Sequence, residues 1–436
     1  MSHWSILLSA TALLFITSNL NWYGESWKDF QESDAKGYYA YLPAVFVYED
    51  LNFGFFDYIE KEKYYIGHPA YDYRELHNHK YINKYYCGTA LVCSPFFVIA
   101  HFVSPFFGFE QDGYSYLYMV FQTIAALFYV ILGLFFMRGL LRQFSISESI
   151  ISIVLVSFLF GSNLFYYTVG ELGMSHVYSF AWVSAFLYYS KRHIESSKTS
   201  HLFLLSMSLG LIVLIRPVNG LVLFFLPFLT KDFRQFKDWI IKAFHNYKSL
   251  GLALLLFSSI VSIQLLIYKI QTGSFLVYSY KEEGFNFLSP EIFNFLFSYQ
   301  KGLFVYTPIF FVAMLGLIAI FKINRFRFYM VLGAFSILIY VFSSWWCWFY
   351  GGSFSSRVMV EFIPVFGLVL GTALQQSSRK LGATIISILT VLIIVCQIQT
   401  FQYRYYEIHW SEMTKERYWD VFLRVDKLIE KTKRPQ

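Results

Sequence analysis

The sequence predicts an all-α, polytopic membrane protein that crosses the bilayer about 11 times, and at most about 13 times. Three observations lead to this fold class. The 436 residues are 56% hydrophobic and only 14% charged, whereas globular proteins are about 25% charged. Apolar runs of membrane-spanning length recur along the chain. Lys and Arg gather in alternate loops between these runs, as expected for loops on the cytoplasmic side.

Most of the predicted spans are single apolar runs that are long enough to cross the bilayer. They lie near residues 4–22, 115–137, 148–168, 173–190, 249–270, 302–321, 328–345, 357–374 and 381–400. Residues 201–230 carry Arg216, Pro217 and Gly220 in mid-run. Because proline and glycine break helices, we expect two short helices that meet at this turn and cross the membrane twice.

Residues 89–107 are apolar but contain Pro95 and Pro105, so they could be a span or a segment folded back at one surface. The basic loops favour the second alternative. They lie around residues 138–142, 191–198, 231–248, 322–327 and 379–380. If these loops and the N-terminus are cytoplasmic, residues 89–107 enter the membrane without crossing it. The first external loop would then carry re-entrant or interfacial helices.

This topology assigns the chemically richest segments to the external side. They are the long loop 21–114, the turn 170–175, the loops 271–301 and 344–357, and the tail 401–436. We expect residues 1–400 to form one membrane domain. The tail 401–436 has apolar residues at helical spacing, which predicts an external amphipathic helix on the membrane surface.

The sequence also argues against several classes of function. The net charge of +7 comes from loops that set orientation, so we expect a lipid bilayer and no nucleic acid as partner. The four cysteines form no CxxC pair, which argues against a zinc site or a disulfide framework. The chain has no glycine-rich nucleotide-binding motif and no HExxH motif.

The segment 32–43 follows the first span and places the carboxylates of Glu32 and Asp34 one residue apart. Such a pair can hold a divalent cation, here Mg²⁺ or Mn²⁺. Alternatively, one carboxylate acts as a base while the other orients it, or both belong to a solvated acidic loop. Tyr38, Tyr39 and Tyr41 follow directly, and they are typical of an interfacial aromatic belt.

Further cations are expected at the external surface, where each could bind a lipid phosphate. Lys84 stands just before the apolar segment 89–107, and Gly88 allows close approach of another backbone. The alternative for Lys84 is snorkelling to the lipid head groups. Lys301 and Arg216 are predicted to be further phosphate-binding cations near the membrane plane.

The loop 344–357 combines tryptophans with a flexible backbone and a cation. Gly351 and Gly352 form an open backbone that can approach a ligand. Arg357 stands at the head of the next helix, where its guanidinium can bind a phosphate with two hydrogen bonds. Glu282 and Glu283, in the preceding external loop, are expected to be solvated.

A carboxylate and an imidazole flank the external turn 170–175. Glu171 and His176 could complete a metal site or a proton-transfer site opposite Asp34, so Asp34 and His176 are the candidate metal ligands. The alternative is a polar cluster at a helix end that is satisfied locally.

Taken together, three motifs resemble those of the GT-C superfamily of integral-membrane glycosyltransferases, in particular the bacterial relatives of protein O-mannosyltransferases and aminoarabinose transferases. They are the acidic pair Glu32 and Asp34, the NKYxxG segment around Lys84, and the WWxWxxGGSFxxR segment ending at Arg357. The chain departs from the family pattern at Cys87 and Ser356, where proline is common.

The resemblance implies a sugar donor carried on polyprenyl phosphate and a lipid, glycan or protein acceptor. It implies transfer at the external, periplasmic face of a bacterial inner membrane. It also implies that Asp34 is catalytic with Glu32 as its neighbour, and that Lys84 and Arg357 face the lipid phosphate. The reaction would be an inverting displacement with Asp34 as the base.

Two other classes of function compete with a transferase. One is a transporter or flippase for lipid-linked saccharides, which would carry charged residues through its spans as a pathway; most predicted spans here lack them. The other is a polymerase or ligase that acts on assembled lipid-linked oligosaccharides with the same chemistry. The sequence leaves the sugar, the acceptor and the metal dependence open.

Overall fold

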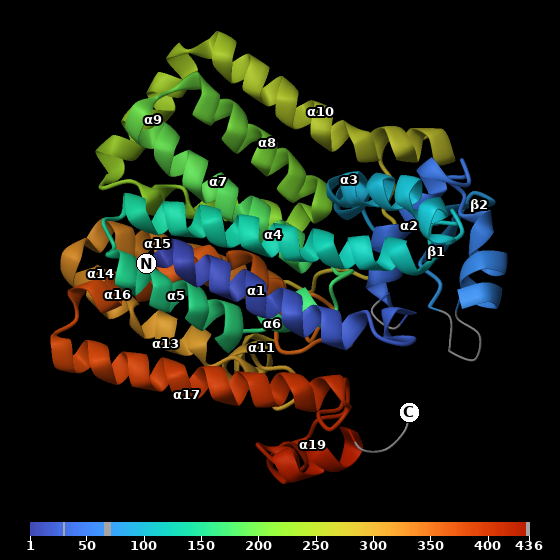
Figure 1. Cartoon of the computed structure of the whole chain (residues 1–436). Helices are drawn as coiled ribbons and strands as arrows, with labels where there is room; N and C mark the ends of the chain where they lie inside the picture. The colour runs from blue at the N-terminus through green and yellow to red at the C-terminus, as the bar shows by residue number, and fades with distance from the viewer. Residues whose placement is uncertain (29–30, 65–70, 433–436) are drawn as a thin grey trace.

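The structure, a computed structural model, describes residues 1–28, 31–64 and 71–432. Within these ranges its regular secondary structure is helical apart from one two-stranded hairpin. Figure 1 shows long helices lying side by side, with the N-terminus at one end of the bundle and the hairpin at the other. The prediction of an all-α, polytopic membrane protein is confirmed.

The first helix is followed by the loop 21–114, which is folded into short elements of its own. The order is α1 (Ser2–Asn21), η1 (Ser26–Lys28), α2 (Asp34–Phe46), η2 (Gly54–Phe56), η3 (Asp57–Tyr64), β1 (Arg74–His77), β2 (Lys80–Asn83), α3 (Gly88–Val103) and η4 (Ser104–Phe107). The antiparallel hairpin, in which Arg74 pairs with Asn83, was not predicted.

The middle of the chain forms the long helices of the bundle. They are α4 (Tyr116–Gln143), α5 (Glu148–Gly161), α6 (Leu164–Val169), α7 (His176–Ser196), α8 (Thr199–Ile215), η5 (Pro217–Phe225), η6 (Pro227–Leu229), α9 (Phe233–His245) and α10 (Tyr247–Thr272). Helix α7 packs between α4 and α8, and α8 packs on α10.

The last part of the chain adds shorter helices, three further long ones and the tail. They are α11 (Ile292–Phe297), α12 (Leu303–Tyr306), α13 (Ile309–Leu315), α14 (Leu317–Ile323), α15 (Arg325–Ser343), η7 (Arg357–Phe362), α16 (Ile363–Gln376), α17 (Arg379–Arg404), α18 (Lys415–Val421) and α19 (Val425–Thr432).

Seven helices of the described residues are long and apolar enough to cross a membrane, and shorter apolar helices accompany them. The predicted break in residues 201–230 is present, because α8 ends at Ile215 and η5 begins at Pro217. Arg216 between them is extended, as expected for a residue that precedes proline. Helix α3 lies beside the end of α4 that is nearest the hairpin (Figure 1). The count of about 11 crossings stays a prediction.

The loops that were predicted to be cytoplasmic meet at the end of the bundle opposite the hairpin. Lys191 Nζ donates to the Leu229 carbonyl at 3.0 Å, and Arg327 Nε donates to the Thr230 carbonyl at 2.7 Å. Ser2, near the N-terminus, donates to Glu148 in the α4–α5 region. The basic loops and the N-terminus therefore share one side, as the charge pattern indicated.

The tyrosines of α2 lie in the core of the first loop and do not form an interfacial belt. Tyr38, Tyr39 and Tyr41 are 6%, 3% and 3% exposed. The Tyr41 hydroxyl donates to the Tyr85 carbonyl at 2.9 Å, and the Tyr39 hydroxyl donates to the Gly113 carbonyl. The prediction of a belt was wrong because these hydroxyls bind backbone carbonyls of the same loop.

The tail folds back onto the end of α17. The Gln402 side chain donates to the Val421 carbonyl at 2.6 Å, and Tyr418 packs against Tyr299 and Tyr306. Figure 1 shows α19 near the end of α17 that points toward the hairpin side. Residues 433–436 of the predicted tail lie outside the described residues, and its external placement stays a prediction.

Candidate functional site

Asp34 is the first residue of α2, and its position follows from the local backbone. Ser33 has a positive φ of 48° with a ψ of −126°, so the chain turns sharply into the helix. A carboxylate in the first helical turn is favoured by the positive end of the helix dipole. The turn and the helix together place the Asp34 carboxylate next to Tyr85 and Arg357, which both donate hydrogen bonds to it.

Both carboxylate oxygens of Asp34 accept hydrogen bonds from distant parts of the chain. The Tyr85 hydroxyl donates to Oδ1 at 2.6 Å, and Arg357 Nη2 donates to Oδ2 at 2.7 Å. Burial alone would raise the pKa of Asp34, but the charge of Arg357, the two hydrogen bonds and the charge of Lys84 hold that pKa below its usual value. Asp34 is therefore ionised at neutral pH.

Tyr85 reaches Asp34 across a glycine. A Cβ atom added at Gly37 would lie 2.2 Å from Cδ2 of Tyr85, so the ring packs directly on the α2 backbone. The Asn83 side chain donates to the Gly37 carbonyl at 2.7 Å and fixes the same approach. Any side chain at position 37 must displace the Tyr85 ring from Asp34.

We therefore expect Gly37→Ala to destabilise the protein by about 1–3 kcal/mol, because an added methyl group overpacks a filled contact. Thermal unfolding of the purified protein measures this change. The control is Gly251→Ala in α10, where a Cβ atom would meet nothing within 4 Å. Equal unfolding temperatures for the two variants would mean that the Tyr85 contact with Gly37 is not close.

Lys84 contacts the loop between α10 and α11. Its Nζ lies 2.6 Å from Oε1 of Glu283 and 5.4 Å from the ring centroid of Tyr280. The expectation that Glu283 is merely solvated was wrong, since it pairs with a cation 199 residues away. As predicted, Gly88 allows close approach: a Cβ there would lie 2.3 Å from the Ile215 backbone nitrogen.

Arg216 and His176 meet at a carboxylate that the sequence analysis missed. Glu361 Oε1 lies 3.1 Å from Arg216 Nη1, 2.9 Å from His176 Nδ1 and 3.4 Å from Asn219 Nδ2. Glu361 is fully buried, and its Oε2 has no hydrogen-bond partner among the described residues. A single carboxylate inside the apolar run 357–374 is a recognisable signal, because charges inside membranes are expensive.

Five of the predicted site residues line one cavity of about 450 Å³. They are Asp34, Lys84, His176, Arg216 and Arg357. Aromatic rings and the backbone of Gly351 and Gly352 complete its wall. One chamber thus forms where four segments meet, which are the first loop, the broken span, the loop 271–301 and the loop 344–357.

The other predicted site residues do not line this cavity. Glu32 is exposed. Glu171 accepts a hydrogen bond from the Tyr166 hydroxyl at 2.9 Å, and Lys301 Nζ lies 4.6 Å from the ring centroid of Tyr403. Burial raises the pKa of Glu171 to about 7 and lowers the pKa of Lys301 to about 7. Both groups interact electrostatically with the charge of Arg357.

The candidate metal ligands are engaged with other groups. Both oxygens of Asp34 accept hydrogen bonds, and His176 Nδ1 contacts Glu361. Across residues 1–28, 31–64 and 71–432, no group of three His, Cys, Asp or Glu side chains could hold a metal ion. As arranged, Asp34 and His176 do not form a site for Mg²⁺ or Mn²⁺. The divalent cation stays a prediction.

The fold and the cavity define a polytopic membrane protein in which a carboxylate and several cations share a chamber at one end of the bundle. No protein-family model matches the chain, and no curated protein matches it. Two solved structures are similar to it.

The first is the crystal structure of ArnT from Cupriavidus metallidurans bound to undecaprenyl phosphate, at a TM-score of 0.53 and 15% identity, over 92% of this chain and 65% of that one. The second is the archaeal oligosaccharyltransferase AglB from Archaeoglobus fulgidus, in complex with an inhibitory peptide and a dolichol-phosphate. Its TM-score is 0.47 at 10% identity, over 96% of this chain and 57% of that one. The chain thus spans less than two thirds of either structure, and the likeness to ArnT shows a shared fold.

Proposed function

We propose that this protein is a glycosyltransferase that moves a sugar from a polyprenyl-phosphate donor to a lipid, glycan or protein acceptor at the external membrane face. The observation that carries the proposal is the ion pair of Asp34 and Arg357, in which Oδ2 and Nη2 lie 2.7 Å apart. Lys84 and Arg216 line the same cavity. A carboxylate beside several cations combines a base with a phosphate-binding site. The resemblance in sequence and the fold shared with ArnT support the same assignment.

The cations of the cavity are each paired with a carboxylate. Lys84 contacts Glu283, Arg216 contacts Glu361, and Arg357 contacts Asp34. An entering phosphate competes for these cations, because charge-assisted hydrogen bonds to phosphate are strong. Arg357 Nε has no hydrogen-bond partner among the described residues, so it is one donor that a phosphate oxygen would satisfy.

Donor binding would also change the basicity of Asp34. When the phosphate draws Arg357 toward itself, Asp34 loses part of the charge that lowers its pKa, while burial continues to raise that pKa. The carboxylate then becomes a better base for the acceptor hydroxyl. Substrate binding would thus activate the base at the moment when it is needed.

The reaction that follows is a single displacement. Asp34 takes the proton of the acceptor hydroxyl, and the acceptor oxygen forms a bond to the anomeric carbon of the sugar. The bond from that carbon to the phosphate oxygen breaks, and its electron pair leaves with the lipid phosphate. Lys84, Arg216 and Arg357 would stabilise the charge that gathers on this leaving group.

The anomeric configuration of the product tests the single displacement, and two further outcomes would favour the alternative functions. With a polyprenyl-phosphate sugar and an acceptor, we expect a new glycosidic bond of inverted anomeric configuration, as measured by NMR of the product. A retained configuration would contradict the single displacement. Relocation of the intact lipid in liposomes without a new bond would favour the transporter or flippase. Activity that requires an assembled oligosaccharide donor would favour the polymerase or ligase.

We further propose that the cavity faces the periplasm from a bacterial inner membrane. Cys347 lines the cavity, whereas Cys87, Cys93 and Cys396 are buried. A membrane-impermeant maleimide added to intact spheroplasts is therefore expected to label Cys347, and undecaprenyl phosphate is expected to slow the labelling. The Cys347→Ser variant is the control. Labelling only after the cells are opened would place the cavity on the cytoplasmic side.

Donor affinity is expected to fall as the pH rises through about 7. Glu171 and Lys301 each lose a proton in this range. Because both losses make the surroundings of Arg357 more negative, the anionic donor binds more weakly at higher pH. The measurement is the KM for the donor between pH 6 and pH 8. In Glu171→Gln combined with Lys301→Met this dependence should flatten, and an unchanged slope would assign it to other groups.

A further inference from the structure

A buried polar cluster lies behind the wall of the cavity, where α7, η5 and η7 meet. Its centre is Glu361, which is 0% exposed and is not among the described residues that line the cavity. Three side chains contact Oε1 of this carboxylate, which are Arg216, His176 and Asn219. Oε2 has no hydrogen-bond partner among the described residues. A buried ion pair with an unsatisfied oxygen contributes little to stability, so stability alone does not explain this carboxylate.

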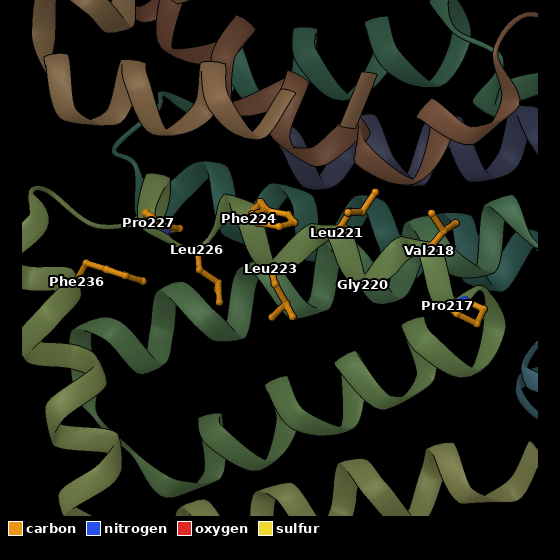
Figure 2. A pocket seen from close by; sticks show the side chains of 9 residues that line it. All are labelled: Pro217, Val218, Gly220, Leu221, Leu223, Phe224, Leu226, Pro227 and Phe236. Carbon is orange, nitrogen blue, oxygen red and sulfur yellow. The ribbon is translucent and has the colours of Figure 1, made fainter. Parts of the chain in front are cut away.

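The 3-10 helix η5 turns Asn219 toward the cluster. In such a helix every third residue lies on the same face, and Asn219, Val222 and Phe225 are the buried residues of η5. Figure 2 shows the other residues of η5, which line an apolar groove, with Pro217 at the turn from α8. Because proline restricts the residue before it, the backbone of Arg216 is held in its extended conformation beside the cluster.

Glu361 holds only one nitrogen of Arg216. Nη1 lies 3.1 Å from Glu361 Oε1 and 3.3 Å from His176 Nδ1, whereas Nη2 and Nε of Arg216 have no hydrogen-bond partner among the described residues. The Arg216 side chain is 16% exposed and lines the cavity. A guanidinium carries five N–H donors in a rigid plane. Arg216 can therefore bind a phosphate oxygen without leaving Glu361.

The other two carboxylates that pair with cations of the cavity are placed differently. Asp34 and Glu283 line the cavity, and their side chains are 20% and 28% exposed. They can turn away when a phosphate takes their cations. Glu361 is enclosed and is contacted by three side chains, so its charge stays in place when the cavity fills.

We infer that Glu361 is a positioning residue that acts through Arg216 and limits how tightly the cavity holds the lipid-phosphate product. The inference rests on the proposed function. The donor is a phosphodiester with one negative charge. When the bond between the anomeric carbon and the phosphate oxygen breaks, the product is a phosphomonoester, which carries a second negative charge above a pH of about 6. The cations of the cavity attract this dianion more strongly than the donor. The fixed charge of Glu361 offsets part of this attraction, so the product leaves and the next donor binds.

Glu361→Gln removes the charge but keeps a side-chain oxygen that can accept from Arg216. At about pH 8, we expect the purified variant to bind undecaprenyl phosphate about 100-fold more tightly than the unaltered protein does. Binding of methyl undecaprenyl phosphate, a diester with the charge of the donor, should tighten only about tenfold, because the energy of a charge pair scales with the charge. In steady-state transfer, kcat and KM for the donor should fall together, since product release slows.

The split between the two lipids separates this role from a structural one, because a loss of packing does not distinguish a monoester from a diester. Glu361→Asp keeps the charge and should retain the relative affinities of the unaltered protein. Glu148→Gln is the matched control, since it removes a carboxylate that pairs with Arg138 and Arg142 at the opposite end of the bundle. It should change neither affinity. Unchanged or weaker binding of undecaprenyl phosphate by Glu361→Gln, or an equal change for both lipids, would overturn the inference.

The unaltered protein gives a second test that does not depend on the folding of a variant. Because three carboxylates balance the three cations of the free cavity, its affinities for the monoester and the diester should differ by less than about tenfold. A preference of about 100-fold or more for the monoester would overturn the counter-charge and leave the phosphate site intact. Binding of neither lipid would overturn the phosphate site itself, and with it the proposed function.

Discussion

Asp34→Asn is expected to lower kcat for sugar transfer by about 100-fold to 10,000-fold, the usual contribution of a general base. Asn keeps the size of the side chain and an oxygen that can accept from Tyr85 or Arg357, but it cannot take the acceptor proton. The affinity for lipid phosphate should stay the same or rise, because Arg357 is no longer held by an opposite charge. A loss of kcat without a loss of donor affinity is thus the signature of a base.

The matched control for this variant is Asp238→Asn, which removes an exposed carboxylate of α9 on the predicted cytoplasmic side. Transfer and donor affinity should equal those of the unaltered protein. Full transfer by Asp34→Asn at saturating donor and acceptor would exclude Asp34 as the base. A parallel loss of donor affinity and folding would instead assign Asp34 a structural role.

Arg357→Met is expected to lower kcat/KM by about 100-fold to 1,000-fold, which is typical when one donor to the developing charge is removed. Arg357 holds Asp34 in the free protein and would bind the phosphate in the complex, so both donor affinity and kcat should fall. The loss of Arg357 also leaves burial as the main influence on the pKa of Asp34. An acid limb should therefore appear in the pH profile of kcat/KM at a higher pH than in the unaltered protein.

Arg357→Lys separates charge from shape. Lysine supplies a positive charge but not the planar fork that can bind Asp34 or a phosphate with two hydrogen bonds. Its kcat/KM should lie between those of Arg357→Met and the unaltered protein. Arg325→Met, at the opposite end of the bundle, removes an arginine that stacks on Phe321 and should leave transfer unchanged. Normal donor binding by Arg357→Met would contradict the phosphate site.

Features that depend on neighbouring residues could be predicted from the sequence. The apolar runs, the break at Arg216 and Pro217, and the close backbone approach at Gly88 all follow from local patterns and are present in the fold. The convergence of Asp34, Lys84 and Arg357 also follows, because the predicted topology assigned all three to the same side.

Features that depend on distant contacts could not be predicted. The Tyr85 hydroxyl binds Asp34 only because Gly37 lets the ring approach, and nothing in the sequence distinguishes Tyr85 from its neighbour Tyr86. The partner of Lys84 is Glu283, which stands next to another glutamate in a polar loop. Glu361 could have been predicted to be functional, since it is the single carboxylate in an apolar span.

The most direct test of the central claim is the release of polyprenyl phosphate by the purified protein in detergent. Detergent removes the two sides of a membrane, so transport cannot contribute to the signal. With a panel of polyprenyl-phosphate sugars and candidate acceptors, we expect at least one pair to yield free polyprenyl phosphate with the unaltered protein and almost none with Asp34→Asn. Equal release by both proteins, or no release from any donor while the lipid-linked sugar still binds in the cavity, would contradict a transferase with Asp34 as its base.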